Sequence, residues 1–346
     1  MKTWGFILLE LAVIGGVAGF VHVGGHPLGG TASAWEASGP RPNSDRDRRA
    51  AFDAPIVDIN RTPAGTFTGI KDELLLEPLR SQKVVDVKFN HGGSSISLRV
   101  TFADGSRAAF KPLQTNVQTV PRKEIASYWL NRLLGLNNVP PAIARTLHRD
   151  DIFGKLVHES VGYLPRLNTE TIFDEEGFTR GEVSYWIPVV VNSNLDAPEK
   201  MADWTRLLAI DGEIPAARLS QLQQLSSLLV FDLLQNNSDR FSGGNLLQSP
   251  DGKILYYMDN TFGFQVEPQG HQKCRDVLAR CQKFSRRLVE ALRRFDGHAL
   301  RQSLESDPGV LTDDEIASVV ARRDVALKYI DGLIGRFGED RVLVFP

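Results

Sequence analysis

The sequence has few cysteines and little excess charge. Only two of its 346 residues are cysteine, Cys274 and Cys281, and no cysteine and histidine cluster has the spacing of a zinc site. On a helix the two lie about 10 Å apart along the axis, which is too far for a disulfide without a break, so two free or buried thiols are the alternative to a bond. The net charge of −2 provides no basic surface, and we expect no nucleic-acid partner.

The composition predicts a folded protein. Apolar residues make up 42% of the chain and charged residues 24%. A chain of this length and composition can bury a sizeable core, and it has room for two lobes or two domains.

The first 53 residues differ from the rest. A mostly apolar run at residues 6–23 contains one charge, Glu10, and suits a retained membrane anchor or an export signal better than a buried core helix. Residues 24–53 are rich in Gly, Pro, Ser, Asp and Arg, and they cannot bury enough apolar surface to offset the entropy lost on ordering. We therefore expect an anchor or signal at 1–23, a flexible stalk at 24–53, and an exported, membrane-tethered or secreted domain at 54–346.

The segment from Phe231 to Phe264 carries the strongest chemical signal. It leaves a helix through a polar loop that contains Asp239, passes Asn245, and forms a predicted hairpin that ends at Asp259. Mg²⁺ prefers hard oxygen ligands, and phosphoryl transfer needs a separate carboxylate to orient the attacking hydroxyl. Asp259 and Asn245 are therefore candidate metal ligands, and Asp239 is the candidate base. The alternative is a solvated turn, the commonest use of such residues.

Strands are predicted early in the folded part, over residues 83–90, 97–102 and 107–111. Apolar residues alternate in the first of these, and turn residues separate each strand from the next. A short strand is also expected within 139–145 and another over 153–164. Residues 165–205 are assigned to a hinge with an insertion.

Lys111 closes the third predicted strand. The residues Ala-Ala-Phe-Lys that end there match the Val-Ala-Ile-Lys pattern of a kinase strand whose lysine holds nucleotide phosphates. The turn one hairpin earlier contains Gly92, Gly93 and Ser94, and its backbone amides can approach phosphate oxygens because glycine has no side chain. The ordinary explanation of such a lysine is a charge that protects a strand edge.

Residues 121–135 predict a helix, with proline at the start, glycine at the end and an apolar stripe between them. Glu124 lies in its first turn. A kinase orients its phosphate-binding lysine by an ion pair with a helix carboxylate, and Glu124 is the candidate for that role. A glutamate in a first turn is also stabilised by the helix dipole alone.

The remaining helices are predicted from apolar periodicity, over residues 218–236, 284–295, 297–304 and 312–337. The first of these is rich in leucine and leads into the loop that contains Asp239. The last begins with a capping box formed by Thr312 and Glu315.

The order of these features resembles a known family. The sequence Asn-x-x-Asp-Arg at 236–240, followed by Met-Asp-Asn-Thr-Phe-Gly-Phe at 258–264, resembles the secretory-pathway atypical kinases, which include the Golgi casein kinase, the xylose kinase and four-jointed. The resemblance covers about residues 83–294. It implies an α+β, bilobal protein-kinase-like fold, with an antiparallel small-lobe sheet at about 54–165 and a largely helical large lobe at about 166–346.

The resemblance also implies roles for the matching positions: phosphate binding by Lys111, its orientation by Glu124, base catalysis by Asp239 and metal binding by Asp259. Asn245 would be a second metal ligand, although it lies one residue further from Asp239 than in protein kinases. Asn260 is a candidate supporting ligand. Because the family stitches its large lobe with disulfides, a bond between the two cysteines stays open in an exported protein.

The implied activity is phosphoryl transfer from ATP, with Mg²⁺ or Mn²⁺, to a Ser or Thr of an exported protein or to a glycan hydroxyl. A pseudokinase that acts as a binding or activating module is the alternative, since the altered asparagine spacing departs from the kinase pattern. An anchored carbohydrate-binding or structural domain is a third, weaker hypothesis.

Overall fold

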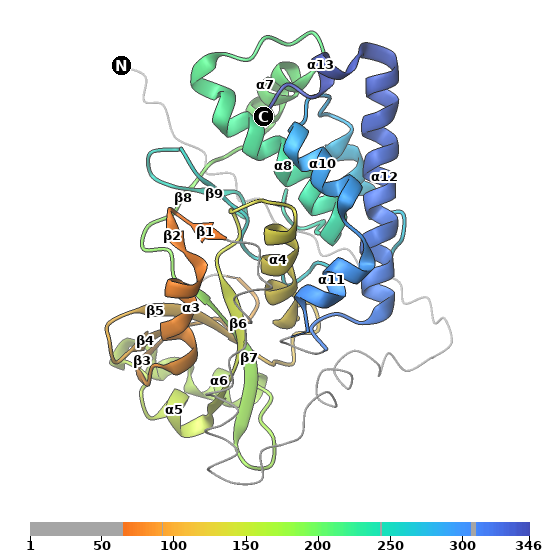
Figure 1. Cartoon of the computed structure of the whole chain (residues 1–346). Coiled ribbons are helices and arrows are strands. Elements are labelled where there is room, and N and C mark those ends of the chain that lie inside the picture. Colours follow the sequence, from red (N-terminus) through yellow and green to blue (C-terminus); the bar gives the residue numbers. More distant parts are fainter. Residues whose placement is uncertain (1–64, 92, 243, 306–308) are drawn as a thin grey trace, which may run out of the picture.

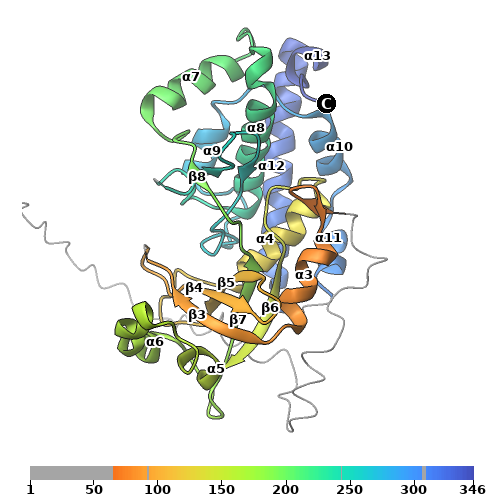
Figure 2. The ribbon, with the colours of Figure 1, turned by 90° about the vertical axis from the view of Figure 1, so that its left-hand side faces the viewer.

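The computed structural model describes residues 65–91, 93–242, 244–305 and 309–346. The predicted anchor or signal at 1–23, the stalk at 24–53 and Gly92 lie outside the described residues. Within the described part of the chain, no helix is both long and apolar enough to cross a membrane. The main sheet lies at one end of the molecule together with a few short helices, and the longest helices lie at the other end (Figures 1 and 2).

Five antiparallel strands form the main sheet, in the order β3-β4-β5-β7-β6. Their bounds are Val84–Phe89 for β3, Leu98–Phe102 for β4, Arg107–Pro112 for β5, Ala142–His148 for β6 and Phe178–Tyr185 for β7. Burial alternates along β4, as expected for a strand with one face on the core. The three predicted strands are confirmed, and so is the short strand expected within 139–145, which is β6.

The fifth strand, β7, corrects the assignment of residues 165–205 to a hinge with an insertion. It pairs with β5 on one side and β6 on the other, so it is central to the sheet. The sheet therefore extends to Tyr185, beyond the predicted boundary near residue 165. Within the same range lie α6 (Leu164–Glu170), β8 (Val191–Asn192) and α7 (Pro198–Leu208).

The strand predicted over 153–164 is wrong. The chain there forms the end of α5 (Arg149–Phe153), a 3-10 helix, η1 (His158–Tyr163), and the start of α6. The segment lies along the open edge of β3, where the backbone N–H of Val87 donates to the carbonyl of Lys155 at 2.8 Å. The Phe89 N–H donates to Ser160 Oγ at 3.0 Å. The Val157 N–H also donates to the Val87 carbonyl at 2.9 Å. An edge strand exposes unpaired backbone groups, and this segment satisfies three of them.

Helix α4 (Arg122–Leu133) lies between the sheet and the helical lobe (Figure 2). Almost all of its residues are buried, because it contacts β6 and β7 on one side and α11 (Gly297–Ser303) on the other. The predicted helix over 121–135 is thus confirmed. A second anchor near its C-terminal end is the pair of Arg132 Nε and Asp72 Oδ2, 2.5 Å apart, which ties α4 to α3 (Asp72–Ser81).

The large lobe is built around α8 (Leu219–Gln235) and α12 (Asp313–Phe337), which pack against each other. The shorter elements around them are η2 (Ala216–Arg218), α9 (Gln272–Leu278), α10 (Arg286–Arg294) and α13 (Glu339–Val342). The predicted capping box at the start of α12 is present, with Thr312 Oγ1 accepting from the Glu315 N–H. One hydrophobic core runs through both lobes.

Two small sheets complete the fold. The predicted hairpin is confirmed as β9 (Leu247–Gln248) and β10 (Leu255–Tyr256), and β8 adds a third strand beside β9. The pair β1 (Thr66–Phe67) and β2 (Ile70–Lys71) precedes α3.

A buried ion pair fixes the N-terminal end of α4 to the large lobe. Arg122 donates to both carboxylate oxygens of Glu315, at 2.8 and 2.9 Å, and the two side chains are only 2% and 5% exposed. We expect Arg122→Leu to lower the free energy of unfolding by about 3–5 kcal/mol, because it leaves a buried carboxylate without its partner. Urea denaturation of the full chain measures this change.

The matched control is Arg301→Leu, which removes an exposed ion pair between α11 and Asp313, in the same first turn of α12 that carries Glu315. Exposed pairs contribute about 0–1 kcal/mol, so this variant should unfold close to wild type. Equal effects of the two variants would contradict the account of how α4 is held.

Candidate functional site

Three charged groups from distant segments meet at the end of β5. The Nζ of Lys111 lies 3.0 Å from Glu124 Oε1 and 2.9 Å from Asp259 Oδ1. Lys111 is near the end of β5, Glu124 is in the first turn of α4, and Asp259 follows β10. The predicted ion pair between Lys111 and Glu124 is therefore present, and it extends to Asp259.

The charges at this site shift the pKa values of Lys111 and Asp259. Burial alone would lower the pKa of Lys111, but the carboxylates of Asp259 and Glu124, together with Glu182 on β7, raise it above its ordinary value. The positive charge of Lys111 in turn lowers the pKa of Asp259. The Asp259 side chain is 53% exposed, whereas that of Lys111 is 13% exposed, so the carboxylate faces solvent and the amine lies behind it.

Asn260 holds Glu124 in place. Its backbone N–H donates to Glu124 Oε1 at 2.8 Å, and its side-chain amide donates to Glu124 Oε2 at 2.9 Å. Its own Oδ1 accepts from Gln235 at 3.0 Å and from Arg240 at 2.5 Å. Because two donors occupy that oxygen, the expected role of Asn260 as a supporting metal ligand is not met. It positions the glutamate instead.

A second buried pair supports the loop after α8. Arg240 is fully buried, and its Nε lies 3.1 Å from Asp232 Oδ2. Arg240 also donates to the carbonyl of Met258, so it joins α8 to the segment that carries Asp259. Burial raises the pKa of Asp232, and the charge of Arg240 opposes that effect. Sequence reasoning did not find Asp232, although a single acid in an apolar helix is a usable signal.

Asparagines shape the loop that contains Asp239. Asn236 ends α8 with a left-handed backbone (φ 58°), a conformation that asparagine tolerates better than most residues. Asn237 accepts from the Asp239 N–H at 3.1 Å and donates to the Asp259 carbonyl at 3.3 Å. The loop of Asp239 is therefore linked to the segment of Asp259 through one side chain.

Asn245 lies beside Asp239. Its amide donates to Asp239 Oδ2 at 3.0 Å and to the Asp239 carbonyl at 3.1 Å. Gly244, with a φ of 82°, precedes it and allows the chain to turn back despite the extra residue in the spacing. Asn245 thus reaches the predicted base, and its role as a metal ligand stays a prediction.

The Asp259 carboxylate and the Asn245 amide oxygen suit a hard divalent cation that keeps most of its bound water molecules. Within the described residues, no group of three His, Cys, Asp or Glu side chains is placed to hold a metal. A cation at Asp259 would therefore take one carboxylate and an amide oxygen from the protein, and water or phosphate would fill the other positions. That is the usual binding mode of Mg²⁺.

The turn between β3 and β4 is at the correct end of the sheet to lie over this site. Leu98 begins β4 and pairs with Phe110, the residue before Lys111, so the turn and the amine share one sheet end. Gly93 has a φ of 81°, and nothing lies within 4 Å of the position that a Cβ would take. The Ser94 carbonyl accepts from Arg166 at 2.7 Å. Phosphate binding by this turn stays a prediction.

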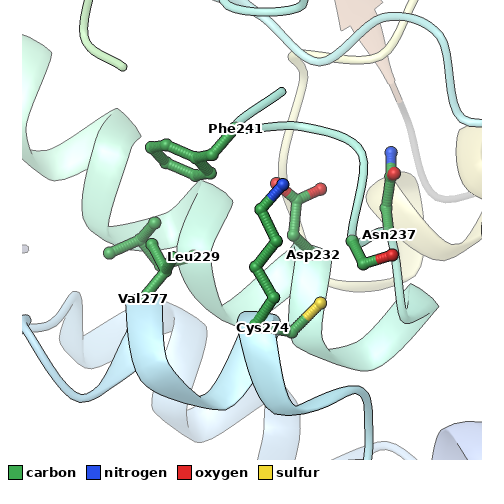
Figure 3. Close-up of a pocket in the computed structure, with 8 residues that line it drawn as sticks. Leu229, Asp232, Asn237, Phe241, Cys274 and Val277 are labelled. Atoms are coloured by element: carbon green, nitrogen blue, oxygen red, sulfur yellow. The ribbon is translucent and has the colours of Figure 1, made fainter. Parts of the chain in front are cut away.

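A small cavity lies between α8, α9 and the loop that follows α8 (Figure 3). Its lining residues are Leu229, Asp232, Asn237, Ser238, Phe241, Lys273, Cys274 and Val277. Cys274 and Cys281 are both free and buried, so the open alternative of a disulfide is not realised. Burial raises the pKa of the two thiols to about 12 and about 11, which makes them poor nucleophiles.

Comparison with known proteins identifies the family. The family described as Four-jointed box protein middle domain matches residues 71–257, more than half of the chain. The chain belongs to the four-jointed box family. The predicted membership of the secretory-pathway atypical kinases is thereby confirmed.

The similar curated proteins include one that is named a kinase and one that is named a pseudokinase. Four-jointed box protein 1 of Xiphophorus maculatus is 28% identical over 278 residues, which cover 70% of this chain and 62% of the relative. Pseudokinase FAM20A of Mus musculus is 22% identical over 307 residues, 72% of this chain and 56% of the relative. The human extracellular serine/threonine protein kinase FAM20C is 34% identical over 105 residues, 27% of this chain and 18% of that protein. The chain spans about three fifths of the length of the first two relatives.

Solved structures confirm the kinase-like, α+β fold. The Golgi casein kinase aligns with a TM-score of 0.62 at 17% identity and covers 79% of this chain and 78% of that chain. The same kinase with Mn/ADP bound aligns equally well. The structure of hydra Fam20 with sugar aligns with a TM-score of 0.61 at 15% identity, covering 90% of this chain and 97% of that chain.

The two hydrogen bonds by which Asn260 holds Glu124, here called the Asn260 clamp, give a stability prediction. Asn260→Ala removes the side-chain hydrogen bonds to Glu124, Gln235 and Arg240 and leaves buried polar groups unpaired. We expect a loss of about 2–3 kcal/mol in the free energy of unfolding, since one unsatisfied buried group costs about 1–3 kcal/mol.

The control is Asn245→Ala, which removes hydrogen bonds to Asp239 at the surface. Its loss should stay below about 1 kcal/mol, because water replaces an exposed partner. If urea denaturation gives the same free energy of unfolding for Asn260→Ala and Asn245→Ala, the Asn260 clamp does not stabilise the fold.

Proposed function

We propose that this member of the four-jointed family is a kinase that transfers the γ-phosphoryl group of ATP to a hydroxyl of an exported protein or glycan. The observation that carries the proposal is the amine of Lys111, held within 3.0 Å of Glu124 and 2.9 Å of Asp259. An oriented lysine beside a solvent-facing carboxylate is the arrangement that binds a metal–triphosphate complex.

Each side chain has a distinct task. Lys111 binds phosphate oxygens, and Glu124 keeps its amine pointed at them. Asp259 and Asn245 hold Mg²⁺ or Mn²⁺, which when bound neutralises charge on the phosphates. Asp239 accepts the proton of the acceptor hydroxyl. Because Lys111 and Asp259 pair directly, phosphate and metal would each compete with that contact.

Gly92, Gly93 and Ser94 belong to the turn that we assign to the phosphates. Lys111 and Glu124 complete the nucleotide site from β5 and α4. The protein acts on the non-cytoplasmic side, secreted or held at a membrane by residues 1–23. This location follows from the apolar N-terminal run and from relatives that are named a Golgi casein kinase and an extracellular kinase.

A pseudokinase is the second candidate function. It is favoured by the hydrogen bond from Asn245 to Asp239, which engages the predicted base, and by the longer spacing between these two residues. FAM20A of Mus musculus, whose match covers 72% of this chain, is named a pseudokinase. The presence of Lys111, Glu124, Asp239 and Asp259 together favours catalysis over this alternative.

The direct test is ATP turnover by the full chain with Mn²⁺ or Mg²⁺. We expect Asp239→Ala and Asp259→Ala each to lower kcat at least about 100-fold, because general-base groups contribute about 10²–10⁴-fold and metal ligands act on the same step. The full chain is compared under identical conditions with both variants by release of ADP.

Asp251→Ala is the matched control, since Asp251 is an exposed aspartate in the turn between β9 and β10. It should retain wild-type turnover. If the wild type binds MnADP but does not exceed Asp239→Ala in turnover, the pseudokinase function replaces the enzymatic one. If it binds no nucleotide, both fail.

A further inference from the structure

Glu182 is a buried acidic residue that the proposed roles leave unused. It lies in the middle of β7 and is 0% exposed. Neither of its carboxylate oxygens makes a hydrogen bond of good geometry with a described residue, and the polar contribution from Ser184 on the same strand only lowers its pKa. Native proteins rarely leave a buried carboxyl group unpaired, so this one calls for a functional explanation.

The sheet places Glu182 directly beside Lys111. The two residues are opposite each other in the pairing of β5 with β7. Opposite side chains of antiparallel strands project from the same face, with Cβ atoms about 4.5–5.5 Å apart. The residue opposite Glu182 on its other side, in β6, is the uncharged Ala144.

Three carboxyl groups therefore lie around the amine of Lys111, and two of them pair with it. The charged groups that act on Glu182 are Lys111 from β5, Glu124 from α4 and Asp259 from the segment after β10. Only Glu124 and Asp259 are within ion-pair distance of the amine. Burial, followed by the charge of Glu124, raises the pKa of Glu182 to about 8, and Lys111 opposes that rise.

We propose that Glu182 is a positioning residue for Lys111 that acts through its proton. As a neutral acid it leaves the amine to Glu124 and to phosphate. As a carboxylate it competes with phosphate for the amine and adds negative charge to the phosphate site. The only bond that changes is the carboxyl O–H, whose proton passes to the solvent. This inference rests on the proposed binding of nucleotide.

The experiment is calorimetric titration of the full chain with MgADP at pH 7 and pH 9. We expect wild-type affinity to fall about tenfold between these values, because one neighbouring charge is worth about one pKa unit of interaction. Glu182→Gln keeps a neutral side chain of the same shape, so its affinity should be the same at both pH values.

Glu159→Gln is the matched control. Glu159 is an exposed glutamate at the open edge of β3, where it pairs with Lys88 instead of Lys111, and this variant should show the wild-type fall. If the affinity of Glu182→Gln for MgADP also falls between pH 7 and pH 9, or if the wild-type affinity does not fall, the inference is overturned while the proposed function stands. If the wild type binds no MgADP at pH 7, the proposed function fails as well.

A second measurement does not depend on a variant's folding. Carboxyl carbon NMR of wild-type protein labelled at glutamate should show one resonance that titrates near pH 8 in the absence of nucleotide. If every glutamate resonance titrates below pH 6, Glu182 is ionised throughout the working range and the inference is overturned.

Discussion

The ammonium group of Lys111, shared between Glu124 and Asp259, is the interaction on which the site depends. It joins a strand of the small lobe, the helix between the lobes and the segment after β10 at one point. The contact of Lys111 with Glu124 is the buried part of this interaction, and a charge pair interacts more strongly where water is excluded. The same burial makes the pair sensitive to any error in the position of the three elements.

Further buried polar contacts set those positions. Arg122 and Glu315 fix one end of α4 to the large lobe, and Asn260 fixes the carboxylate of Glu124 itself. Arg240 links Asn260 to Asp232 in α8, so the loop of Asp239 and the segment of Asp259 are held by one side chain. Such networks are tolerated in a core only where nearly every member is paired, which accounts for their value in positioning.

Local sequence signals were sufficient to find the principal residues. Lys111 ends an alternating strand, Glu124 is in the first turn of a capped helix, and Asp259 follows a hairpin, so each stands at a boundary that turn chemistry marks. The kinase-like fold followed from their order. Glu182 was missed because its strand was assigned to a hinge, and its burial is set by neighbouring strands rather than by its own segment.

The helices at 149–170 were also missed, since short apolar runs do not distinguish strand from helix. The pairing of Arg240 with Asp232 was not predicted for a related reason: it is a tertiary contact across the end of α8, and the motif at 236–240 does not name the partner of its arginine. Sequence therefore located the charged groups that meet at Lys111 better than the groups that hold them in place.

A structure of the full chain with ADP and Mn²⁺ tests the central claim most directly. The account predicts that the Asp259 carboxylate leaves Lys111 for the metal, while the Lys111 amine contacts phosphate and remains paired with Glu124. A nucleotide bound elsewhere, with the contact of Lys111 and Asp259 unchanged, would contradict it.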